Sequence, residues 1–225
     1  MSPERYLKET SSLDFRHPAV AALVNEVRQG GGTLKEQAVR MFLRVRDDVR
    51  YDPYAILLVK EAFTASATLE GKKGYCVTKA ILFAAGLRAL GIPARLGFAD
   101  VVNHLATKRL LEIMRTDVFS YHGYVELLLD GTWVKATPAF NASLCEKFGA
   151  APLEFDGVHD AMLQPVNREG KQFMEYVRDH GTFEDFDLDA MLRAWKSEYP
   201  HLFLEAAPTP EGDFEAEAVA GRQSR

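Results

Sequence analysis

The sequence predicts an α+β fold in which a central, buried helix packs on a mostly antiparallel sheet, with extra helices at both ends of the chain. Residues 76–90 are apolar nearly all round, which is typical of a helix that is covered on every side. Two β-prone segments, 121–129 and 132–137, are joined by Asp130-Gly131, a dipeptide typical of tight hairpin turns. Helices and strands thus follow one another in blocks, as in α+β domains.

Two amphipathic helices are expected before the central one, at residues 19–29 and 34–50. The run Gly30-Gly31-Gly32 separates them, because consecutive glycines lose much backbone entropy in a helix. Thr33 and Glu36 have the spacing of a capping box, so the second helix is expected to begin directly after Thr33.

The middle of the chain is expected to hold the central helix and the sheet. Gly91 and Pro93 end the helix at 76–90, since glycine suits the residue after a helix and proline cannot continue one. A strand at 94–102 and a helix at 104–114 are expected to precede the hairpin.

The C-terminal third is expected to begin with a short helix that Asn141 caps and that ends near Gly149. Amphipathic patterns predict two further helices, at 170–180 and 187–199. The tail, residues 206–225, has little to bury and is expected to be disordered.

Length and composition indicate one globular domain at residues 1–205, since 225 residues with 47% hydrophobic and 26% charged residues can bury a substantial core. A net charge of −5 argues against a dedicated nucleic-acid-binding protein. No apolar run approaches the roughly 20 residues of a membrane span, and the N-terminus lacks the apolar segment of a secretory signal. We therefore expect a cytoplasmic protein with neither nucleic-acid nor membrane partners.

Cys76 is the first candidate for chemistry, because it follows a glycine-containing loop and opens the predicted central helix. Unpaired N–H groups and the positive end of the helix dipole stabilise a thiolate there, and the same N–H groups can serve as an oxyanion hole. The alternative interpretation is a small buried hydrophobe, the usual role of an unpaired cysteine. The second cysteine, Cys145, lies in a short amphipathic segment and is expected to be packed.

His122, near the start of a predicted strand, is the candidate base for such a nucleophile. Counting outward from the hairpin turn pairs Tyr124 with Thr137, which places Thr137 diagonally from His122 on the same face. Thr137, or Asn141 just beyond it, could orient the imidazole.

Three segments in this order resemble the transglutaminase-like superfamily. They are Gly74-Tyr75-Cys76 with the helix end Arg88-Ala89-Leu90-Gly91-Ile92-Pro93-Ala94-Arg95, then His122-Gly123-Tyr124-Val125-Glu126, and then Trp133-Val134-Lys135-Ala136-Thr137-Pro138. The resemblance covers about residues 33–141 and implies a papain-like core with Cys76 as nucleophile and His122 as base. Thr137 stands where the family has an aspartate, so the third member of the triad stays open between Thr137 and Asn141, with Asp100 and Asp117 as other sources of charge.

The resemblance implies a cysteine-dependent enzyme that cleaves or transfers an acyl group from a peptide or small amide through a thioester. A hydrolase or peptidase is favoured over a protein crosslinker, by analogy. No cofactor is expected, and the loops at 53–73 and 103–120 are expected to line the site.

Two other hypotheses compete with this one. The missing aspartate favours a catalytically silent fold that acts as a binding or scaffold module. The segment from Glu154 to Asp160 contains ligand types suited to a metal ion, but its spacing fits no known ligand pattern and is more typical of a polar turn.

Overall fold

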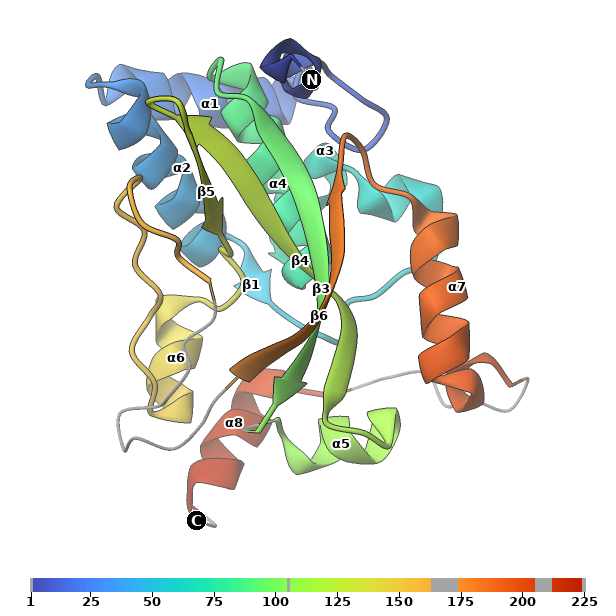
Figure 1. Cartoon of the computed structure of the whole chain (residues 1–225). Coiled ribbons are helices and arrows are strands. Elements are labelled where there is room, and N and C mark those ends of the chain that lie inside the picture. The colour runs from blue at the N-terminus through green and yellow to red at the C-terminus, as the bar shows by residue number, and fades with distance from the viewer. Residues whose placement is uncertain (1, 105, 163–173, 205–211, 224–225) are drawn as a thin grey trace.

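The computed structural model describes residues 2–104, 106–162, 174–204 and 212–223. Its centre is an antiparallel four-stranded sheet in the order β5-β4-β3-β6 (Figure 1). The strands are β3 (Ala94–Asn103), β4 (Val118–Leu129), β5 (Thr132–Ala136) and β6 (Met174–Phe183). The turn between β4 and β5 has Asp130 and Gly131 at positive φ, as the hairpin signal requires.

Helix α4 (Cys76–Ala89) is the central helix. Every residue from Val77 to Arg88 is buried, and the helix contacts both β3 and β4. It also contacts α1 (Pro18–Gln29), α2 (Leu34–Asp48) and α3 (Ala65–Gly71). The predicted core, a helix covered on every side and packed on the sheet, is therefore confirmed.

Local sequence signals explain where several elements begin. Thr33 and Glu36 form the expected capping box at α2, with Glu36 Oε2 2.7 Å from the Thr33 backbone nitrogen. At α4 the N-cap is Tyr75, whose backbone N–H donates to Thr78 Oγ1 over 3.1 Å. This bond gives the N–H of the N-cap residue an acceptor, and the helix begins at the next residue, Cys76.

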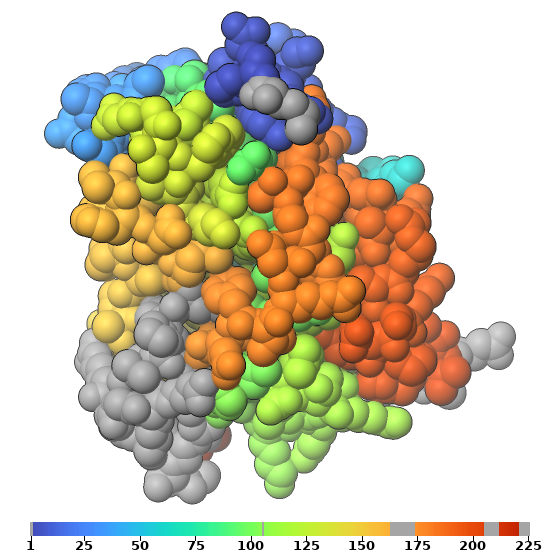
Figure 2. Space-filling view, viewed as in Figure 1, coloured from blue at the N-terminus to red at the C-terminus, as the bar shows by residue number. Residues whose placement is uncertain are grey.

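The remaining elements are short. They are η1 (Pro3–Leu7), β1 (Arg50–Tyr51), η2 (Lys60–Phe63), β2 (Lys73–Gly74), α5 (Lys108–Met114), α6 (Ala142–Phe148), α7 (Leu188–Glu198), η3 (Pro200–Phe203) and α8 (Phe214–Gln223). Strands β1 and β2 pair in parallel, which sets Tyr51 beside Gly74, two residues before Cys76. Figure 2 shows β6 and α7, in orange, on one face of the molecule.

The helix predicted at 170–180 is wrong over its described part, because residues 174–183 form strand β6. This segment is half exposed and pairs with β3, so its backbone hydrogen bonds come from a partner strand that local periodicity cannot reveal. Residues 170–173 lie outside the described residues.

The prediction of a disordered tail is also wrong for residues 214–223, which form α8. Phe214 and Ala218, four residues apart, are both buried against the molecule. This spacing is that of one helix face and could have been read from the sequence. The rest of the tail, 206–211 and 224–225, lies outside the described residues.

Candidate active site

Cys76 lies at the first turn of α4, where backbone N–H groups act on its thiol. Those of Gly123, Val77 and Cys76 itself lower the pKa of the thiol. Two of them belong to the helix N-terminus and the third to strand β4. Such donors, fixed before any substrate arrives, can hold the negative oxygen that forms when a carbonyl is attacked.

Gly123 allows β4 to approach this turn so closely. A Cβ atom at this position would lie 2.9 Å from Val77 Cα and 3.1 Å from the Cys76 carbonyl oxygen, so no larger residue fits without movement. His122 immediately precedes Gly123, and His122 and Cys76 line the same cavity. The structure thus brings together the predicted nucleophile and base.

His122 is 3% exposed, and its Nε2 atom is buried without a hydrogen-bond partner among the described residues. Burial lowers the pKa of this imidazole to about 4, because the charged form loses its hydration. Its ring meets the Tyr176 ring edge-on, with 6.3 Å between centroids. At neutral pH His122 is therefore uncharged and able to accept a proton.

The thiol is also held in its neutral form. Burial raises the pKa of Cys76 to about 11, against the opposing effect of the three backbone N–H groups. The sequence predicted a stabilised thiolate from the helix N-terminus alone, and the structure differs because desolvation outweighs that effect. The resting pair is a thiol and a neutral imidazole.

Thr137 follows β5 directly and is 3% exposed. The register of the hairpin pairs Val125 with Ala136, so the predicted alignment of Tyr124 with Thr137 continues the observed register. The Thr137 hydroxyl lies 3.9 Å from Met162 Sδ and within hydrogen-bonding reach of the Tyr176 hydroxyl. Tyr176 thus contacts both His122 and Thr137. Neither Tyr176 nor Thr137 carries a negative charge.

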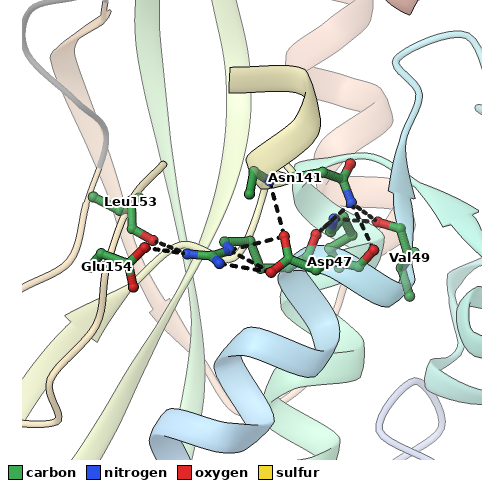
Figure 3. Close-up of polar contacts among 8 residues, drawn as sticks. Asp47, Val49, Asn141, Leu153 and Glu154 are labelled. Atoms are coloured by element: carbon green, nitrogen blue, oxygen red, sulfur yellow. Dashed lines mark hydrogen bonds and ion pairs between the residues drawn. The ribbon is translucent and has the colours of Figure 1, made fainter. Parts of the chain in front are cut away.

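Asn141 is engaged elsewhere, which overturns its role as the alternative orienting residue. Its Nδ2 donates to the carbonyl oxygens of Arg46 and Val49 over 2.6 and 3.0 Å (Figure 3). Its Oδ1 accepts from the Tyr51 N–H over 2.6 Å. Asn141 occupies the N-cap position of α6, but Asp47 Oδ1 accepts from the Ala142 N–H there. The amide therefore anchors the end of α2.

Asp100 binds the backbone of Tyr121, the residue that precedes His122. Its carboxylate accepts from the Tyr121 N–H over 3.1 Å and contacts His180 Nε2 at 2.7 Å. Tyr121 has φ +64°, a backbone conformation that is rare for an aromatic residue, and it directly precedes His122. The sequence signal was a carboxylate within an apolar strand. Asp117, the other acidic candidate, is exposed.

The cavity beside Cys76 and His122 has a volume of about 200 Å³. The predicted lining loops contribute Ile56, Leu58, Leu110, Ile113 and Met114, whereas Phe63 lies in the core and Leu57 is exposed. Sequence reasoning missed the contribution of the C-terminal part. Those residues are Met174, Trp195, Tyr199, Leu202, Phe203 and Phe214.

In the segment considered for metal binding, the polar side chains form hydrogen bonds and ion pairs with other protein groups. Asp156 contacts the His159 ring at 2.7 Å, Glu154 pairs with Arg46, and Asp160 accepts from the Lys135 N–H. Over the ranges that the structure describes, no three histidine, cysteine or acidic residues are grouped so as to hold a metal ion. The same ranges contain no helix of the length and apolarity needed to cross a bilayer.

Comparisons with known proteins bear on this geometry. The sequence profile of the transglutaminase-like superfamily matches residues 21–138. Among solved structures, one named "Putative Cysteine Protease from Cytophaga hutchinsonii" is similar at 17% identity and a TM-score of 0.45, over 80% of this chain and 46% of that chain. This chain therefore spans less than half of that protein's length. The curated proteins yield no match. Because the profile covers more than half of the chain, this protein belongs to the transglutaminase-like superfamily.

Proposed function

We propose that this protein is a cysteine-dependent enzyme that removes an acyl group from a peptide or small amide and passes it to water. One observation carries the proposal: Cys76, at the first turn of α4, lines the same cavity as His122, a buried histidine whose Nε2 has no hydrogen-bond partner among the described residues. Family membership agrees with this assignment but leaves the reaction open.

The steps follow from the neutral thiol–imidazole pair. His122 accepts the Cys76 proton as the sulfur bonds to the substrate carbonyl carbon, and the backbone N–H groups stabilise the resulting oxyanion. The C–N bond then breaks, His122 returns the proton to the departing amine, and a thioester remains on Cys76. Water attacks the thioester with His122 again taking a proton. The acid departs and the sulfur regains its proton from His122.

The test uses p-nitrophenyl butyrate, whose C–O bond breaks in place of the amide bond, followed by intact-mass measurement. We expect one butyryl group on the wild-type protein and on the Cys145→Ala variant, since Cys145 is buried in α6. The Cys76→Ala variant should carry none. Equal acylation of Cys76→Ala, or a wild type that neither carries a butyryl group nor releases butyrate, would refute the assignment of the nucleophile.

A second candidate function is a catalytically silent module, and one observation favours it: neither Thr137 nor Tyr176, the residues grouped near His122, carries a negative charge. Deacylation separates the two functions. An enzyme should release butyrate repeatedly, with release impaired in a His122→Asn variant. A silent module should show no turnover, and His122→Asn should leave any slow acylation unchanged.

A further inference from the structure

The cavity at Cys76 has an uncharged, largely aromatic lining. No aspartate, glutamate, lysine or arginine occurs among the described residues that line it. Its walls come from distant parts of the chain, including Ile56, Met114, Phe119, Trp195 and Phe214. The fold therefore gathers apolar side chains from several distant segments into the cavity that Cys76 lines.

The polar atoms of three aromatic residues in the lining are already bonded to the protein. The Tyr199 hydroxyl donates to the Val118 carbonyl over 2.9 Å, and Trp195 Nε1 donates to the Ser120 carbonyl over 3.1 Å. The Tyr54 hydroxyl donates to Glu217 Oε2 over 2.8 Å. These rings thus have little remaining capacity to bind a polar ligand.

The carboxylate that binds the Tyr54 hydroxyl is also neutralised. Glu217, on α8 close to Phe214, accepts from the Thr107 hydroxyl over 2.7 Å as well as from Tyr54. Its other oxygen lies 3.7 Å from Arg109 Nε. A charged group in the cavity would lose its hydration and meet no opposite charge among the described lining residues, which is costly.

The volume of the cavity indicates the size of group that can enter it. The volume of about 200 Å³ exceeds the roughly 150 Å³ of an apolar protein cavity that accepts benzene. One aromatic ring or a chain of about six carbons can therefore enter. Of the two halves of an amide, the acyl group stays bonded to Cys76 through both steps, whereas the amine must leave before water reacts. An enclosed cavity suits the half that stays.

We infer that Cys76 acts on substrates whose acyl group is bulky, hydrophobic and uncharged, and that this cavity holds the acyl group. The inference rests on the proposed function for its chemical step. It assigns specificity to the apolar lining rather than to recognition of a peptide backbone or a charged side chain.

The kinetic test compares kcat/KM for p-nitrophenyl esters of acetate, butyrate, hexanoate and 3-phenylpropionate with that for the hemisuccinate. Each added methylene should raise kcat/KM about threefold until the cavity is full. The hemisuccinate, which carries a negative charge, should react at least about 100-fold more slowly than butyrate. Equal rates along the series, or a hemisuccinate as fast as butyrate, would overturn the inference while the proposed function stands.

Two matched substitutions locate the effect. Met114→Lys introduces a cation at the cavity wall and should abolish the preference for hexanoate while improving the hemisuccinate. Leu57→Lys makes the same change at an exposed residue outside the lining and should leave the series unaltered. If both variants behave alike, the selectivity does not arise in this cavity.

A binding measurement separates specificity from catalysis. Trp133→Phe leaves Trp195 as the single tryptophan, and Trp195 lines the cavity. In the Trp133→Phe/Cys76→Ala protein, hexanamide should change the Trp195 fluorescence at concentrations at least tenfold lower than succinamate. A response at equal concentrations, or none to hexanamide, would overturn the inference even if the esters acylate Cys76.

Discussion

Helix α4 carries two polar side chains one turn apart, the half-buried Cys76 and the buried Lys79, and their surroundings are opposite. Lys79 belongs to a group that we call the α2 polar cluster: Arg46, Asp47, Lys79 and Asn141. Cys76 and His122 line the cavity that we propose to be catalytic, which we call the catalytic cavity. In the α2 polar cluster, Lys79 Nζ donates to the Arg46 carbonyl over 2.9 Å, and Arg46 pairs with Asp47 (Figure 3). In the catalytic cavity, His122 Nε2 is buried without a partner among the described residues.

The difference separates polar groups that stabilise the fold from a polar group that we propose to act in catalysis. Buried polar groups ordinarily have partners because an unpaired one costs stability, and the α2 polar cluster follows this rule around the C-terminus of α2. The catalytic cavity departs from it at a group whose chemistry requires a free proton acceptor. Departures of this kind are typical of functional sites.

The largest expected effect on stability comes from the α2 polar cluster. Asn141→Ala leaves the Tyr51 N–H without its acceptor and removes donors to two carbonyls, so the free energy of unfolding should fall by about 2–4 kcal/mol. Urea unfolding measures this. The butyrylation rate of the folded protein should change little. A variant of normal stability that no longer acylates would instead give Asn141 a direct role at His122.

His122 should impose a pH dependence on stability. Its pKa falls from 6.5 to about 4 on folding, so between these values the unfolded chain binds a proton that the folded protein excludes. Stability should therefore decrease as pH falls through this range, by about 3 kcal/mol in total. Urea unfolding at pH 7, 5.5 and 4 measures the decrease, and the His122→Asn variant should lack this component. An unchanged slope in His122→Asn would show that other groups cause it.

A carboxylate at position 137, where the family has an aspartate, should give the catalytic cavity a negative charge, as Asp47 gives the α2 polar cluster one. Thr137→Asp places a negative charge next to Tyr176, which contacts His122, and should raise the pKa of His122 by about one unit. NMR titration of the imidazole measures the change. Thr137→Asn, similar in size but uncharged, is the control and should leave the pKa near that of wild type. Equal shifts in both variants would attribute the change to packing.

The same contrast explains what the sequence could reveal. Signals between near neighbours predicted the start of α4 at Cys76 and the hairpin register that aligns Tyr124 with Thr137. The partners of Asn141 lie about 90 residues away, and no local pattern encodes them. Strand β6 depends on pairing with β3, and the positive φ of Tyr121 depends on Asp100 in another strand. Long-range contacts therefore determine what Asn141 and Asp100 bond to, and local reasoning had to leave both as choices.

The most direct test of the account is the rate of Cys76 alkylation by iodoacetamide between pH 5 and 10.5, in wild type and in His122→Asn. Burial raises the pKa of Cys76 to about 11, so reaction near neutral pH depends on His122 accepting the proton. Wild type should react at least about tenfold faster than His122→Asn at pH 7, and the two rates should converge toward pH 10.5. Cys76→Ala should take up no label. Superimposable profiles for wild type and His122→Asn would contradict the claim that Cys76 and His122 act as a pair.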